Sequence, residues 1–142
     1  MKSFLEEVAA RTPAPGGGAV AAMTGASAAA LVSMAARFSS ADAVASAGDE
    51  LRARLVQLAT DDAEAYTAVL AARGEARKEA MRVATEVPRA IASAAAEVAT
   101  LAHGLVETGN RNLVGDARVA ELLAEAAAKA AAVLVEINTG SG

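Results

Sequence analysis

With 142 residues, the chain has the size of one domain, and we expect a single domain over residues 1–142. Hydrophobic residues make up 54% of the sequence but aromatic residues only 2%, so alanine, the strongest helix former, supplies much of the apolar content. A formal net charge of -4 without a basic run argues against nucleic acid as a partner, and the absence of Cys beside a single His excludes disulfides and argues against a metal site.

The first predicted helix covers residues 3–11, because Ser3 and Glu6 have the spacing of a capping box. A loop rich in proline and glycine follows, and it cannot continue the helix. Its last four residues are Pro15, Gly16, Gly17 and Gly18. Successive glycines before a helix allow a ligand, best an anion, to approach the backbone N–H groups. The same residues also suit a tight interhelical turn in which Gly18 permits close packing.

A second helix is predicted over residues 18–38, and it is apolar or small almost all round. Such a helix is typically buried, so we expect it to be the central element of the fold. The uncharged stretch from Thr12 to Ala36 is long enough to span a bilayer. Its content of Ala, Gly, Ser and Thr nevertheless favours a close-packed core helix, and we expect no membrane association.

The third predicted helix covers residues 49–73, and one carboxylate interrupts its apolar stripe. The stripe consists of Leu51, Leu55, Leu58, Ala65, Tyr66 and Val69. Asp62 occupies a position in this stripe, whereas Asp61 and Glu64 lie on other sides of the helix. A buried carboxyl has a raised pKa and is a candidate general acid or base. Asp62 could instead bond the end of another helix, and Tyr66 could share its site or simply pack.

The fourth predicted helix covers residues 75–108, where Pro88 should kink or divide it and Gly109 should end it. His103 lies opposite the apolar stripe of this helix and is expected to be solvated. Before the fifth helix, over residues 116–137, Asn112 or Asp116 is most simply an N-cap.

The fifth helix is expected to turn its larger apolar side chains inward and its charged side chains outward. The predicted inward residues are Val119, Leu122, Leu123, Ala126, Ala130, Val133, Leu134 and Ile137. The predicted outward residues are Arg118, Glu121, Glu125, Lys129 and Glu136. Residues 139–142 are expected to fray. Since no segment has the alternation of a strand, the sequence predicts an all-α bundle of about five helices.

Five segments taken together resemble the cyclodeaminase domain of formiminotransferase-cyclodeaminase and stand-alone methenyltetrahydrofolate cyclohydrolases. The segments are Phe4-Leu5-Glu6-Glu7-Val8, residues 11–22 around the glycines, Asp62-Ala63-Glu64-Ala65-Tyr66, Ala84-Thr85-Glu86-Val87-Pro88, and Gly109-Asn110 with Asp116 and Ile137-Asn138. They follow the order of the family and cover nearly the whole chain. Two positions depart from it: Gly115 replaces a common Ser, and residues 134–138 read Leu-Val-Glu-Ile-Asn where many members have Asn-Val-Arg-Ile-Asn.

The resemblance implies a cytoplasmic, dimeric helical enzyme with a folate site at or near the subunit interface and no cofactor beyond the tetrahydrofolate substrate. It implies catalytic roles for Asp62 and Tyr66. It implies substrate-binding roles for Pro15, Gly16, Gly17, Gly18, Asn110, Asp116 and Asn138. The expected reaction is cyclisation of 5-formiminotetrahydrofolate to 5,10-methenyltetrahydrofolate with release of ammonia. Hydrolysis of methenyltetrahydrofolate to 10-formyltetrahydrofolate, or a non-catalytic folate-binding or oligomerisation module, remains open.

Overall fold

The computed structural model describes residues 1–140 of the chain. Within that range it contains no β-strand but five α-helices and one short 3-10 helix. These are α1 (Lys2–Ala9), α2 (Gly17–Phe38), α3 (Asp42–Ala71), α4 (Gly74–Thr108), η1 (Arg111–Leu113) and α5 (Val114–Asn138). The predicted all-α fold is confirmed. The predicted fraying falls partly on residues 141 and 142, which lie outside the described residues.

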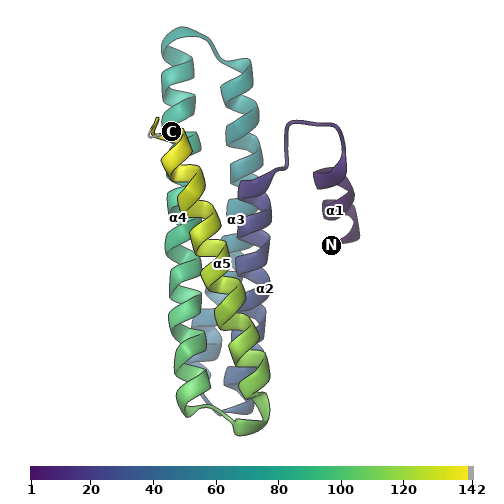
Figure 1. Cartoon of the computed structure of the whole chain (residues 1–142), viewed down its shortest axis with the longest axis vertical. Coiled ribbons are helices and arrows are strands. Elements are labelled where there is room, and N and C mark those ends of the chain that lie inside the picture. Colours follow the sequence, from purple (N-terminus) through teal and green to yellow (C-terminus); the bar gives the residue numbers. More distant parts are fainter. Residues whose placement is uncertain (141–142) are drawn as a thin grey trace.

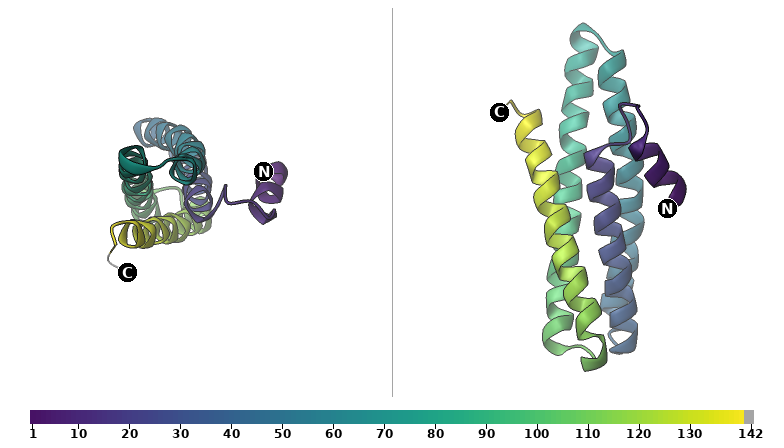
Figure 2. Two further views of the ribbon diagram at one scale, coloured as in Figure 1. Left: turned by 90° about the horizontal axis from the view of Figure 1, so that it is seen from above. Right: turned by 45° about the vertical axis from the view of Figure 1, so that its right-hand side comes forward.

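Helices α2 to α5 form an elongated four-helix bundle, and α1 lies beside it at the end of an extended loop (Figures 1 and 2). As expected, α2 is the buried helix of the fold, because it packs against α3, α4 and α5. Its buried positions are almost all Ala or Gly, together with Val32 and Ser33. Such small side chains let the neighbouring backbones approach closely. Within residues 1–140, α2 is the one helix apolar and long enough to cross a membrane, and 61% of its most apolar window is buried inside the bundle.

Two predicted helix starts are wrong. The first helix begins at Lys2 with Met1 as its N-cap, so Ser3 lies inside the first turn and no side-chain capping bond forms. The third helix begins at Asp42, seven residues before the predicted Asp49. Its first turns pack against α2, where the Ser33 hydroxyl donates to the carbonyl of Ala45 at 3.3 Å. Tertiary packing therefore extends a helix whose local sequence signal is weak.

The fourth helix passes through Pro88 without being divided, and Gly109 ends it as predicted. The fifth helix begins at Val114, directly after η1, with Leu113 as its N-cap. Neither Asn112 nor Asp116 caps it, so that prediction is wrong. A side-chain cap is present at η1 instead, where Asn110 is the N-cap residue and its side chain accepts a hydrogen bond from the backbone N–H of Asn112.

The predicted inward face of α5 is also wrong. The side of α5 that packs in the bundle is formed by Ala117, Ala120, Ala124, Ala127 and Ala131, with Glu121 beside them. The larger apolar residues lie on the outer surface; Leu122 is 53% exposed and Ile137 is 60% exposed. A narrow face of alanines thus makes the close contact that the sequence pattern assigned to leucine, valine and isoleucine.

Glu121 was expected to face solvent but is buried, with its carboxylate between His103 and Arg118. Its Oε2 lies 2.6 Å from Nδ1 of His103, and Arg118 donates to Oε1. These bonds, led by the one from His103, hold the pKa of the Glu121 carboxyl below its usual value. The side chain of His103 is more than half exposed, as predicted, but it also joins α4 to α5 through its contact with Glu121.

Candidate active site

A pocket of about 290 Å³ lies where the glycine loop enters α2. Segments from α3, α4 and the end of α5 complete its wall. The lining residues are Pro13, Ala14, Gly16, Gly17, Gly18, Asp62, Tyr66, Ala84, Pro88, Leu134 and Asn138. The structure therefore brings together six of the predicted site residues, which come from three separate parts of the sequence.

Asp62 is the acidic residue of this pocket, and α3 presents it to the first turn of α2. Its carboxylate accepts a hydrogen bond from the backbone N–H of Ala19, one of the amides that a helix leaves free at its N-terminus. Burial raises the pKa of the Asp62 carboxyl, and the bond from Ala19 opposes that shift without cancelling it. The predicted bond to the end of another helix is thus present, and the same side chain lines a pocket, while the role of Asp62 as an acid or base stays a prediction.

Gly18 is required where Asp62 meets α2. A Cβ atom at Gly18 would overlap the carboxylate of Asp62, whereas a Cβ atom at Gly17 would meet nothing within 4 Å. The predicted close packing at Gly18 is therefore real, and the group that packs there is the candidate catalytic carboxyl. Gly16 and Gly17 leave the backbone open on the pocket side.

Two further polar side chains reach the pocket. Tyr66 follows Asp62 by one turn of α3, and its side chain is 48% exposed, so it lies on the rim rather than in the apolar stripe where the sequence pattern placed it. Asn138, the last residue of α5, donates from Nδ2 to the carbonyl oxygen of Ala84 in α4 at 3.2 Å.

The other predicted substrate-binding residues lie elsewhere. Pro15 lines a neighbouring groove between α1, α2 and α3. Asn110 lies at the opposite end of the bundle, where its side chain donates to the carbonyl of Phe38 and its backbone N–H donates to Ser39. Asp116 is in the first turn of α5, about 33 Å along the helix from Asn138 at 1.5 Å per residue. Within one chain, Asn110 and Asp116 do not reach the pocket.

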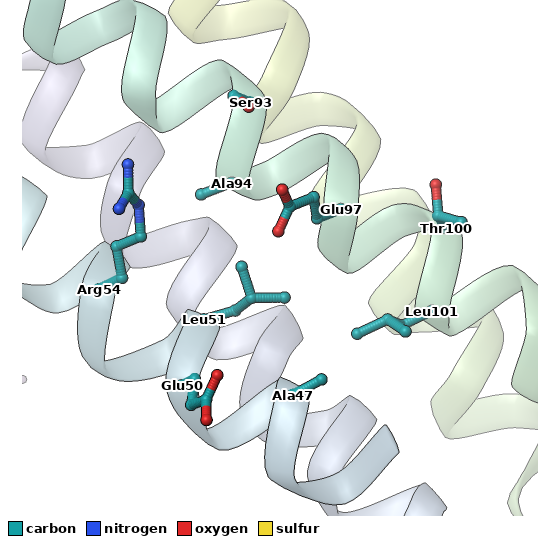
Figure 3. A pocket seen from close by; sticks show the side chains of 9 residues that line it. All are labelled: Ala47, Glu50, Leu51, Arg54, Ser93, Ala94, Glu97, Thr100 and Leu101. Carbon is teal, nitrogen blue, oxygen red and sulfur yellow. The ribbon is translucent and has the colours of Figure 1, made fainter. Parts of the chain in front are cut away.

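A larger groove of about 590 Å³ lies between α3 and α4, away from the glycine loop (Figure 3). Its charged side chains are Glu50, Arg54 and Glu97, all of which are exposed to solvent. None of the predicted site residues lines it. The smaller pocket is the better candidate active site, because it combines a half-buried carboxyl, a helix N-terminus and an exposed backbone loop.

Sequence reasoning missed several wall residues, among them Pro88, Ala84 and Leu134. The sequence predicted only a kink or break of the fourth helix at Pro88, although this residue belongs to one of the five family-like segments. Its proximity to Asp62 depends on how α3 packs on α4, which no local pattern encodes. Among residues 1–140, no group of three or more His, Cys, Asp or Glu side chains could hold a metal ion.

Comparison with known proteins identifies the family and the fold of the chain. A family model described as Formiminotransferase-cyclodeaminase matches residues 1–141. Methenyltetrahydrofolate cyclohydrolase of Methylorubrum extorquens is 36% identical over 162 aligned positions, which cover 97% of this chain and 78% of that protein. The crystal structure of formiminotetrahydrofolate cyclodeaminase from Thermotoga maritima has a TM-score of 0.94 and 32% identity, covering 99% of this chain and 78% of the other.

Proposed function

The chain belongs to the formiminotransferase-cyclodeaminase family of folate one-carbon metabolism, and on that premise we propose that it cyclises 5-formiminotetrahydrofolate to 5,10-methenyltetrahydrofolate and releases ammonia. The observation that carries the proposal is the half-buried carboxyl of Asp62, which lies in the pocket against the first turn of α2. Burial raises the pKa of its carboxyl, so more of it keeps a proton as the pH approaches neutrality. A carboxyl of that kind suits the donation of a proton to a leaving nitrogen.

The proton balance of the reaction defines what the site must do. In cyclisation, N10 attacks the formimino carbon on N5, a new C–N10 bond forms, and the bond from carbon to the formimino nitrogen breaks. That nitrogen carries one hydrogen in the neutral substrate and must gain two protons to leave as ammonia. One proton comes from N10 and the other from an acid. In the proposed mechanism Asp62 donates its proton to the leaving nitrogen, takes the proton of N10 and passes it to the same nitrogen, so that ammonia leaves and Asp62 ends ionised.

The surrounding residues fit this role. The ionised form of Asp62 balances the positive charge of the methenyl product. Free N–H groups at the start of α2 favour an anion, and the carboxylates of the folate tail are placed at the glycine loop around Gly16 and Gly17. Tyr66 on the rim contacts the substrate. No cofactor beyond the tetrahydrofolate substrate enters this scheme.

Hydrolysis of methenyltetrahydrofolate to 10-formyltetrahydrofolate is the second candidate, and the 36% identity to a cyclohydrolase favours it. In that reaction water attacks the same carbon and Asp62 acts as the base. The two reactions share the pocket and the bridging carbon, and they differ in the nucleophile and in the group that leaves.

The deciding experiment follows the absorbance band of methenyltetrahydrofolate with purified protein. Growth of the band from 5-formiminotetrahydrofolate, with one ammonia released for each methenyl group formed, supports the proposed cyclodeaminase. Protein-dependent loss of added methenyltetrahydrofolate, without activity on the formimino substrate, replaces it by the cyclohydrolase. Folded protein that acts on neither substrate overturns both and leaves a folate-binding or oligomerisation module.

The proposed enzyme acts in the cytoplasm as a homodimer. The apolar outer face of α5 supports the dimer, because Val119, Leu122, Val133 and Ile137 lie on one side of that helix and are exposed in a single chain. Exposed apolar faces of this kind mark association sites. The pocket residues Leu134 and Asn138 belong to the same helix, so the pocket lies close to the proposed interface.

A further inference from the structure

Pro88 lies buried in the middle of α4, a position that costs the helix one of its backbone hydrogen bonds. Proline has no N–H, so the carbonyl of the residue four positions earlier loses its helical donor. That residue is Ala84. The proline ring also presses against this carbonyl and tilts it away from the helix axis. Ala84 therefore offers a carbonyl oxygen to whatever lies beside α4.

The side-chain amide of Asn138 forms a hydrogen bond with this oxygen. Its Nδ2 donates to the carbonyl of Ala84 at 3.2 Å, across 54 residues of sequence. Both residues line the pocket that holds Asp62. Ala84 is half-buried, and a carbonyl that lacks a donor there is costly, so this bond replaces the one that the proline removes.

The bond also fixes which way the amide of Asn138 points. An amide group is planar and has its donor and its acceptor on opposite sides. When Nδ2 is held by Ala84, Oδ1 must point away from α4. Within residues 1–140 no side chain or backbone group donates to Oδ1, which leaves it as an acceptor beside the pocket.

We propose that Pro88 is a positioning residue, which acts through the Ala84 carbonyl to hold Asn138 with Oδ1 toward the ligand. Asn138 then accepts a hydrogen bond from a nitrogen-bound hydrogen of the ligand. This inference rests on the proposed function, in which that nitrogen is the one that leaves as ammonia. Asp62 supplies a proton to this nitrogen, and Asn138 accepts a hydrogen bond from the hydrogen that the nitrogen already carries and so orients it.

The orientation can be tested without any turnover. The sequence has three Asn and one Gln, so a ¹H–¹⁵N spectrum of the full chain contains only four pairs of side-chain amide signals. The Asn138→Ala variant assigns the pair of Asn138. In the Pro88→Ala variant a new N–H at position 88 can bond Ala84, and Asn138 is released. We expect its amide pair to shift and to exchange with solvent faster, while the pairs of Gln57, Asn110 and Asn112 stay in place.

Arg89→Ala is the matched control, since it alters the neighbouring exposed position of α4 without adding an N–H opposite Ala84. It should leave the Asn138 pair unchanged. Unchanged Asn138 signals in a folded Pro88→Ala protein would overturn the proposed positioning role. Movement of all four pairs to the same extent in Pro88→Ala would do so too, because it would reveal a general change of fold.

Kinetics test the second half of the proposal with the formimino substrate. Loss of one hydrogen bond should lower kcat/KM about three- to tenfold in either Pro88→Ala or Asn138→Ala. Because Pro88 acts through Asn138, adding Pro88→Ala to Asn138→Ala should change kcat/KM less than about twofold. If the losses of kcat/KM in the two single variants multiply in the double variant, Pro88 does not act through Asn138.

Failure of this proposal and failure of the proposed function give different results. If the wild-type protein turns over neither folate but the Asn138 signals move as expected, the proposed reaction fails while the positioning by Pro88 stands. If turnover is observed but the Asn138 signals do not respond to Pro88→Ala, the reaction stands and the positioning role is lost.

Discussion

Asp62 is a candidate catalytic carboxyl whose burial opposes its ionisation. Its carboxyl is half-buried, and burial raises its pKa despite the bond from the N–H of Ala19. We predict that Asp62→Asn lowers kcat by about 100-fold or more, which is the usual contribution of a positioned acid. The free energy of unfolding at neutral pH should stay equal or rise, because a neutral amide is cheaper to bury than a charged carboxylate. Steady-state kinetics and urea unfolding measure the two effects.

The pH dependence follows from the direction of the same pKa shift. Because the folded pKa of Asp62 lies above its unfolded value, the folded state binds the proton more tightly. The contribution of Asp62 to stability is therefore most favourable at low pH and falls as the pH rises through the folded pKa. If Asp62 is the acid, wild-type kcat should also fall on that rise. An unfolding profile in which Asp62→Asn matches the wild type at every pH would contradict the shift.

Gly18 offers a more local probe of the same carboxyl. A Cβ atom at Gly18 overlaps the Asp62 carboxylate, so Gly18→Ala should push that side chain out of place. We expect a loss of activity of at least about tenfold, since small displacements of catalytic groups have large effects. Gly104→Ala is the matched control, because its Cβ meets nothing within 4 Å and Gly104 does not line the pocket. Equal activity of the two variants would show that the approach of Asp62 to Gly18 is not needed for catalysis.

At the level of residues, the sequence predicted the most informative position but not its surroundings. Asp62 could be singled out because it interrupts an apolar stripe at helical spacing. Its contact with Ala19 and Gly18 could not, since that contact depends on the register of α3 against α2. Asn110 and Asp116 were grouped with the site by resemblance alone, and in one chain they lie at the far end of the bundle. Their substrate-binding roles stay predictions.

At the level of helices, the bundle depends on close approach between α2 and α3. A Cβ atom at Gly48 would lie 2.5 Å from the hydroxyl of Ser33 and 3.3 Å from the carbonyl of Ala29. Because backbone atoms cannot move aside cheaply, Gly48→Ala should lower the free energy of unfolding by about 1–3 kcal/mol. Gly104→Ala, on the open side of α4, should instead raise it by up to about 1 kcal/mol. Urea denaturation of the two variants tests this; equal changes would show that packing at Gly48 is loose.

Helix number and order were predictable because long apolar periodicities and the glycine and proline breaks are local features. The faces of the helices were not. In α5 the rule that large apolar residues face the core fails, since Ala120, Ala124 and Ala127 occupy the core and Leu122 and Val133 do not. An alanine face packs closely only against a helix whose own side chains are small. This property belongs to α2, whose buried residues are almost all Ala or Gly, and it cannot be read from α5 alone.

At the scale of the whole molecule, one chain leaves too much apolar surface uncovered. Its core consists largely of alanine, which buries little area per residue. Its larger side chains form a continuous outer stripe on α5, and α1 stands beside the bundle without a buried residue of its own (Figure 2). A thin core and an exposed stripe are both accounted for if a second copy covers the stripe.

We predict that the wild-type chain sediments as a dimer, with twice the mass of the 14.1 kDa protomer. Leu122→Glu should shift it to the monomer, because a symmetric interface would bury the new charge in both subunits. Lys78→Gln is the matched control; it changes the net charge by the same single unit but alters an exposed residue of α4, outside the apolar stripe of α5, so the dimer should persist. A wild-type protein that remains monomeric at tens of micromolar would contradict the interface. If Leu122→Glu is monomeric and still folded, its activity then decides whether the pocket beside Leu134 needs the second copy to work.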